Sequence, residues 1–132
     1  MEQLIYVSLP GASIGGGDVF DIVQKSATRN TARGITGFLL FAEGLFFQCI
    51  EGTNAALDGL MADLAGDPRH YAITELSRKP ISERAYPNWA MTRVYAGNGP
   101  SSLAAQLATM GISSADIAQV ERFRAAHTIR AA

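Results

Sequence analysis

Five side chains in this sequence are suited to holding a flat, uncharged molecule: Tyr6, Asn30, Gln48, Trp89 and Met91. Their phenol, carboxamide and thioether groups supply hydrogen-bond donors and acceptors but no general acid or base with a useful pKa. The sequence shows neither a Ser-His-Asp nor a Cys-His arrangement, and it has no paired carboxylates that would indicate hydrolysis. These residue types therefore indicate binding of a ring that carries hydrogen-bonding groups on its edge.

Gln48 lies in a markedly apolar stretch, residues 30–52, which is predicted to contain a β-hairpin. Two apolar segments, residues 35–42 and 45–50, flank Glu43-Gly44, a pair typical of a tight turn. Alternation along the second segment places Phe46, Gln48 and Ile50 on one face of the sheet, and Leu45, Phe47 and Cys49 on the other. Both faces are then apolar, so we expect the sheet to be covered on both sides. An amide buried among such side chains needs a hydrogen-bonding partner.

Two elements ahead of the hairpin position the other candidates. Residues 2–9 read as a strand, with Tyr6 and Ser8 on the same face. Residues 18–31 have the apolar spacing of a helix that packs on a sheet, and one further turn directs Asn30 toward the core. Taken alone, Asn30 could equally be a helix-end residue that caps its own backbone.

The order of the elements predicts an α+β fold, a ferredoxin-like βαββαβ arrangement with a fifth strand. After the hairpin the sequence predicts a helix at 53–66, strands at 71–77 and 88–95, and helices at 103–110 and 114–127. In this layout the first two helices share one sheet face, and the strands of Tyr6 and Gln48 are central neighbours. We expect the two C-terminal helices to cover the opposite face or to make a subunit contact.

Composition excludes several classes of protein. At 132 residues the chain is one domain, and its net charge of −1 with scattered basic residues indicates neither a nucleic-acid nor a membrane partner. No apolar run reaches the roughly 18 residues of a membrane span, and no signal peptide is recognisable. A single cysteine, Cys49, suits a reducing cytoplasm, where we expect the protein to reside. Two distant histidines give a zinc site poor support.

Four segments resemble one known family. LIYVS at residues 4–8, ARGITGFLLFAEGLFFQCIEG at 32–52, DPRH at 67–70 and YPNWAM at 86–91 resemble the BLUF family, the blue-light sensors that use FAD. The resemblance implies a flavin-binding domain at residues 1–96. It also implies that residues 97–132 are a linker and two short helices, like the tail of short, single-domain members.

The resemblance implies a role for each of the five candidates. Tyr6 matches the tyrosine that passes an electron and a proton to the excited flavin, and Gln48 matches the glutamine that bridges the phenol and the flavin N5/O4 edge. Rearrangement of that amide strengthens a hydrogen bond to O4, and the absorption shifts slightly to the red. Asn30 matches the residue that holds the O4/N3 side of the ring. Trp89 and Met91 match the pair proposed to relay the signal.

Further contacts to FAD, or to FMN or riboflavin in its place, are implied for Arg29, with Ser8 and Ser26 as minor polar contacts. Arg69 and His70 are two more candidates for the cofactor site, although they could also form a solvated turn. Arg29 departs from the family pattern, in which asparagine or histidine is frequent at this position. Its guanidinium could bond the flavin O2 or a phosphate, or point to solvent.

The resemblance also implies that the chain is a sensor and not an enzyme. We expect it to signal to a separate effector protein, as a homodimer or larger homo-oligomer. Two alternatives remain: a small acylphosphatase-type enzyme that uses Arg29 and Asn30, and a binding module without photochemistry. A yellow protein whose absorption shifts under blue light would exclude both.

Overall fold

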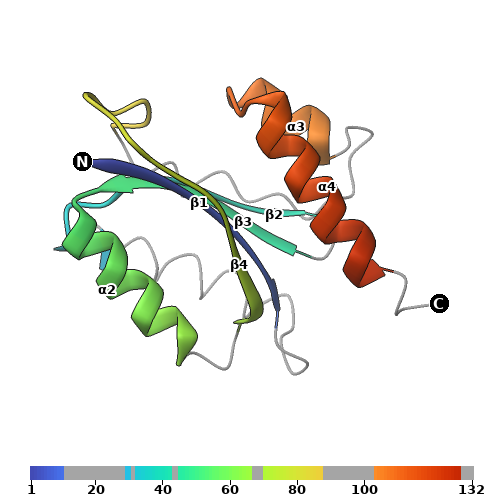
Figure 1. Ribbon diagram of the computed structural model, residues 1–132, viewed down its shortest axis with the longest axis horizontal. Coiled ribbons are helices and arrows are strands. Elements are labelled where there is room, and N and C mark those ends of the chain that lie inside the picture. Colours follow the sequence, from blue (N-terminus) through green and yellow to red (C-terminus); the bar gives the residue numbers. More distant parts are fainter. Residues whose placement is uncertain (11–28, 31, 43–44, 67–69, 88–102, 129–132) are drawn as a thin grey trace.

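The computed structural model describes residues 1–10, 29–30, 32–42, 45–66, 70–87 and 103–128 (Figure 1). At its centre lies an antiparallel sheet with the strand order β2-β3-β1-β4. The strands are β1 (Glu2–Pro10), β2 (Thr36–Ala42), β3 (Leu45–Gly52) and β4 (His70–Pro80). The described helices are α2 (Asn54–Ala65), α3 (Leu103–Thr109) and α4 (Ser114–Thr128).

The strand order confirms the ferredoxin-like arrangement, with β1 and β3 as central neighbours. The β2–β3 hairpin forms where it was predicted, and Ala42 pairs with Leu45 next to the turn. β4 is longer than the predicted strand at residues 71–77. Its pairing with β1 continues as far as Pro80, opposite Glu2, and Arg78 Nε donates to Glu2 Oε1 at 2.6 Å across the sheet.

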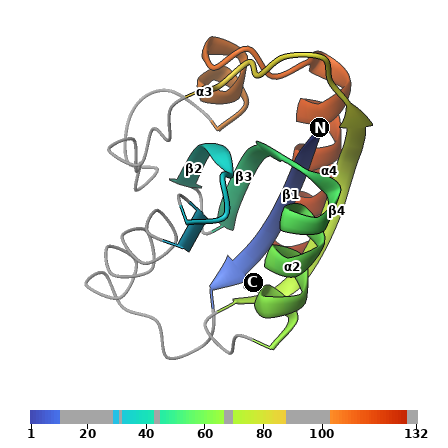
Figure 2. The ribbon, with the colours of Figure 1, turned by 90° about the vertical axis from the view of Figure 1, so that its left-hand side faces the viewer.

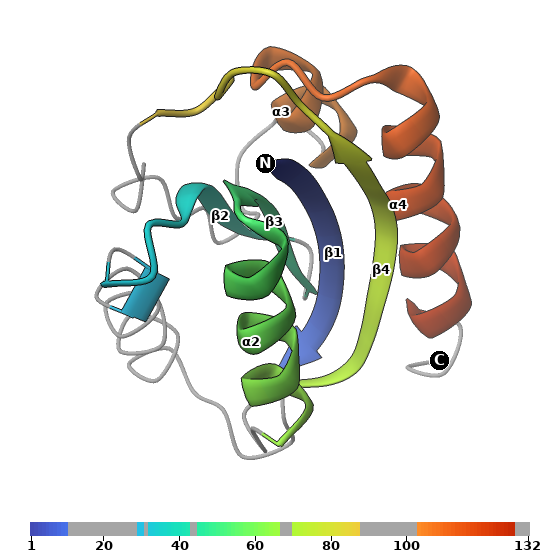
Figure 3. The same ribbon diagram turned by 60° about the vertical axis from the view of Figure 1, so that its left-hand side comes forward.

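One face of the sheet is covered by α2 (Figures 2 and 3). The helix begins as predicted, since the Thr53 side chain accepts a hydrogen bond from the Ala56 amide at 3.2 Å. Its apolar stripe, Leu57, Leu60 and Leu64, packs against the β-sheet residues Leu4, Tyr6 and Ile50 and against Ile35. Each buried leucine stabilises the fold by roughly 1.5–3 kcal/mol, so this stripe fixes α2 over β1 and β3.

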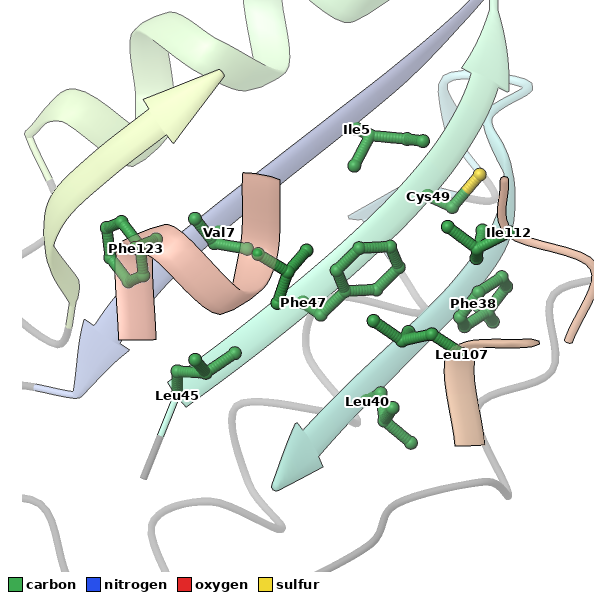
Figure 4. Close-up of a cluster of buried hydrophobic side chains, with 11 residues drawn as sticks. Ile5, Val7, Phe38, Leu40, Leu45, Phe47, Cys49, Leu107, Ile112 and Phe123 are labelled. Carbon is green, nitrogen blue, oxygen red and sulfur yellow. The ribbon is translucent and has the colours of Figure 1, made fainter. Parts of the chain in front are cut away.

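The opposite face is covered by α3 and α4 (Figure 4). Their buried side chains, and that of the turn between them, are Leu107, Ile112, Val120 and Phe123. They pack on the face that carries Leu45, Phe47 and Cys49, as the alternation of β3 predicts. The C-terminal helices therefore cover the sheet, which was the first of the two alternatives for them.

Two predicted elements fall outside the described residues. Only the last turn of the helix predicted at 18–31 is described, and the predicted strand at 88–95 is not. In the described parts of the chain, every helix is too short or too polar to cross a membrane.

Candidate functional site

Tyr6 and Gln48 are brought together by the pairing of the two central strands. Their Cα atoms are direct partners in the antiparallel register of β1 and β3, so both side chains project from the same face. This is the face covered by α2, because Tyr6 packs in the cluster that contains the α2 leucines. Both side chains are buried, with 1% of Tyr6 and 2% of Gln48 exposed.

Asn30 reaches the same side of the sheet from the end of a helical turn. Its carbonyl accepts hydrogen bonds from the amides of Arg33 at 3.1 Å and Ile35 at 2.8 Å, which ends the helix. Gly34 has a φ of +70°, a left-handed conformation that glycine adopts without strain and that starts the chain toward β2. Figure 1 shows this segment and α2 on the same side of the sheet, away from α3 and α4.

These three side chains hold buried polar atoms that the described part of the chain leaves unsatisfied. Tyr6 Oη, Gln48 Oε1 and both amide atoms of Asn30 have no hydrogen-bond partner among the described residues. Leaving such an atom unpaired costs about 1–3 kcal/mol, so the group as a whole costs several kcal/mol. A neutral ligand with donors and acceptors along one edge would remove that cost.

The Tyr6 phenol is held in its protonated form. Burial raises its pKa far above the ordinary value, and the nearby Arg29 guanidinium acts in the opposite direction. Arg29 itself is half-buried. A buried tyrosine that cannot ionise can lose an electron readily only if its proton leaves as well.

The other predicted site residues are placed only in part. Ser8 is fully buried on β1, two residues beyond Tyr6. His70 begins β4, where its backbone pairs with Pro10, but its side chain is outside the description. Ser26, Arg69, Trp89 and Met91 lie outside the described residues.

Sequence reasoning missed Leu39, the third member of the row that contains Tyr6 and Gln48. Leu39 on β2 is the direct register partner of Gln48 and is fully buried. The three side chains therefore run across β1, β3 and β2 on one face. Counting the register back from the predicted hairpin turn would have found it.

A second missed feature is the polar cluster that holds residues 81–87. The fully buried Glu51 carboxylate accepts hydrogen bonds from the amides of Ala85 at 3.0 Å and Tyr86 at 2.9 Å, and from Gln3 Nε2 at 3.0 Å. Arg84 donates to the carbonyls of Glu51 and Gly34 and to Thr36 Oγ1. The signal for it was an acidic residue directly after a run of apolar β3 residues.

A family of proteins described as "BLUF: Sensors of blue-light using FAD" matches residues 1–92 of the sequence. The chain belongs to the BLUF family. The beta subunit of photoactivated adenylate cyclase from Euglena longa is 37% identical over 93 residues, which cover 70% of this chain and 11% of that protein. The alpha subunit from Euglena gracilis is 41% identical over 71 residues, or 54% of this chain and 7% of that protein. The chain thus spans a small part of these curated relatives.

Solved structures of BLUF proteins share the fold. The dark-state structure of BlrB, a BLUF protein, superposes with a TM-score of 0.71 at 32% identity, covering 95% of this chain and 96% of that one. A bacterial light-regulated adenylyl cyclase gives a TM-score of 0.71 at 29% identity, covering 97% of this chain and 35% of that one. BLUF domains are flavin-binding sensors of blue light, and this chain is one of them.

The residues present fit the FAD that the family uses. The edge of a flavin ring carries ring-nitrogen and carbonyl acceptors and one N–H donor, all uncharged. The Tyr6 hydroxyl, the Asn30 amide and the Gln48 oxygen, which have no partner in the part of the chain that the structure describes, offer both donors and acceptors to such an edge. Family membership favours this interpretation of Arg29 and Asn30 over that of an acylphosphatase-type site.

Proposed function

We propose that Tyr6 and Gln48 carry the light reaction of this BLUF domain. The observation that supports the proposal is a directly opposed, buried pair whose Oη and Oε1 atoms lack a hydrogen-bond partner among the described residues. The flavin, when bound, supplies absorption of blue light and an acceptor for an electron. Tyr6 would give an electron to that acceptor together with its Oη proton, and the Gln48 amide would pass the proton to the same ring edge. Both then return to Tyr6, so no lasting oxidation results.

The Gln48 side chain stays rearranged after the electron and proton have returned to Tyr6. A carboxamide both donates and accepts, so rotation or tautomerisation changes which group it presents to the ring edge. In the rearranged state the Gln48 amide would donate a stronger hydrogen bond to the ring edge, which would move the absorption slightly to the red. The amide therefore has two states with different hydrogen bonds, and light changes their populations.

Asn30 holds the remaining edge of the ring, since its amide is buried beside the same sheet face with both polar atoms unpaired among the described residues. Arg29, Ser26, Arg69 and His70 provide further contacts to the cofactor. The same ring-edge contacts accept FMN or riboflavin, which share the flavin ring with FAD.

The signal leaves through Trp89 and Met91 and through the C-terminal helices, to a separate effector protein. The domain then comprises residues 1–96, and residues 97–132 form its linker and two-helix tail. The family match over residues 1–92 supports the extent of the domain, and the structural match to BlrB, which covers 95% of this chain, includes the tail. In this proposal the protein is a cytoplasmic sensor without catalytic activity of its own and acts as a homodimer or larger homo-oligomer.

Absorption spectroscopy of the purified protein tests the proposal. The wild type is expected to be yellow, to shift to the red under blue light and to recover in the dark. Tyr6→Phe and Gln48→Leu are expected to abolish the shift while flavin stays bound. Ile5→Val is the matched control, because Ile5 lies on the same strand but packs on the opposite face, and it should switch normally. Normal switching by Tyr6→Phe would show that the proton path is wrong, and a colourless wild type after FAD is added would favour a non-photoactive module.

A further inference from the structure

Arg33 connects the segment that carries Asn30 to α2. Its amide donates to the Asn30 carbonyl at 3.1 Å, and its Nη2 forms an ion pair with Asp63 Oδ2 on α2. The guanidinium lies against a glycine of that helix, since a Cβ at Gly59 would be 4.0 Å from Arg33 Cζ. The guanidinium is thus held at the boundary between the Asn30 segment and α2.

Among the described residues, the two terminal nitrogens of this guanidinium differ, because Nη2 has a partner and Nη1 has none. Arg33 Nη1 is buried and has no hydrogen-bond partner among the described residues, although the side chain as a whole is 30% exposed. A buried N–H on a charged group is expensive to leave unpaired. The Asp63 carboxylate is bonded by Nη2, and it makes no hydrogen bond to Nη1. An additional oxygen acceptor on the Nη1 side would complete the site.

We propose that Arg33 Nη1 binds a phosphate of the flavin's tail. The inference rests on the proposed function, because it requires the ring to be held at Asn30, whose carbonyl is bonded to the Arg33 amide. A guanidinium is always charged and its planar fork matches phosphate oxygens, whereas a ribityl hydroxyl offers it no charge. Arg33 is then a residue that favours FMN and FAD over riboflavin.

The test compares three flavins that differ only in the tail. Dissociation constants for riboflavin, FMN and FAD are measured by quenching of flavin fluorescence, for the wild type and for Arg33→Gln. A hydrogen bond to a charged group contributes about 1.5–3 kcal/mol, so FMN and FAD are expected to bind roughly 10- to 100-fold more weakly to Arg33→Gln. Riboflavin is expected to bind both proteins within about twofold, and Arg33→Lys is expected to recover part of the loss.

Asp63→Asn is the matched control, since it removes the ion pair and keeps the guanidinium. It is expected to bind FMN and FAD at least as well as the wild type. Equal losses for riboflavin and FMN in Arg33→Gln, no loss at all, or a loss in Asp63→Asn as large as in Arg33→Gln would each overturn the proposal. The red shift of Arg33→Gln loaded with riboflavin distinguishes failure of the Arg33 proposal from failure of the proposed light reaction. It should be normal if Tyr6 and Gln48 act as proposed, whatever Arg33 binds.

Discussion

Replacement of Glu51 by glutamine is expected to loosen the segment that precedes the proposed relay residues. Glu51 Oε2 accepts from Gln3 Nε2 and from the Ala85 amide, both at 3.0 Å, and Oε1 accepts from the Tyr86 amide at 2.9 Å. All three partners are donors. In Glu51→Gln one of the two oxygens becomes an NH₂ group, which then faces at least one N–H.

The least costly orientation of the new amide keeps its oxygen at the Oε2 position and loses the bond to Tyr86. A hydrogen bond to a charged acceptor contributes about 1.5–3 kcal/mol, and the two remaining bonds lose their charge assistance. We therefore expect Glu51→Gln to lower the free energy of unfolding by about 3 kcal/mol. For a domain of ordinary stability, about 5–15 kcal/mol, that is a substantial fraction.

Urea denaturation followed by circular dichroism measures the loss of stability, and hydrogen exchange measures where it occurs. The Ala85 and Tyr86 amides are expected to exchange much faster in Glu51→Gln than in the wild type. Gln3→Met is the control: it removes one donor, should cost about 1–2 kcal/mol and should leave both amides protected. If the two amides in Glu51→Gln exchange as slowly as in the wild type, the carboxylate does not hold this segment and the reasoning fails.

Three further predictions concern residues outside the proposed site. Gly37→Ala should cost about 3 kcal/mol or more in urea denaturation, because φ is +142° and the new Cβ would lie 2.0 Å from the Cys49 carbonyl oxygen; stability like that of the wild type would contradict it. Burial raises the pKa of the Cys49 thiol from 9.0 to about 12, so the unfolded thiol ionises first. Stability should therefore be lost as the pH rises from about 9 to 12, and Cys49→Ala should flatten that part of the profile. Tyr86→Phe removes the bond from Oη to the Met110 carbonyl at 2.7 Å but keeps the ring edge on Phe38, so it should cost about 1 kcal/mol and speed amide exchange in α3, and unchanged exchange there would count against this contact.

The site pair could be predicted because two simple rules determine it. Period-two alternation assigns Gln48 to one face of β3, and the βαββαβ order makes β1 and β3 neighbours. These rules do not determine the register between β1 and β3. The structure shows that Tyr6 pairs directly with Gln48. The same alternation left the face with Phe47 and Cys49 apolar, so cover by the C-terminal helices was one of two predicted alternatives, and the structure confirms it.

The polar clusters could not be predicted, because their partners are far apart in sequence and have no periodicity. Glu51 binds the Tyr86 amide 35 residues away, and Arg84 binds the Gly34 carbonyl 50 residues away. Nothing in the local composition of residues 81–87 indicates which carboxylate they meet. Arg33 was missed for a similar reason: its role depends on a guanidinium nitrogen left unpaired among the described residues, which is visible only with the side chain in place.

The alternation of β3 also relates the site to the C-terminal helices. Gln48 projects toward the α2 face, while its two chain neighbours, Phe47 and Cys49, project into the cluster that contains Leu107 of α3. Interiors are packed to the density of organic crystals, so a shift of the β3 backbone at Gln48 displaces the side chains on both faces. Because the strand is shared, a change in the Gln48 amide that moves the backbone reaches the packing under the tail through adjacent residues of one strand. Transmission to the tail therefore does not require a chain of polar contacts through the sheet.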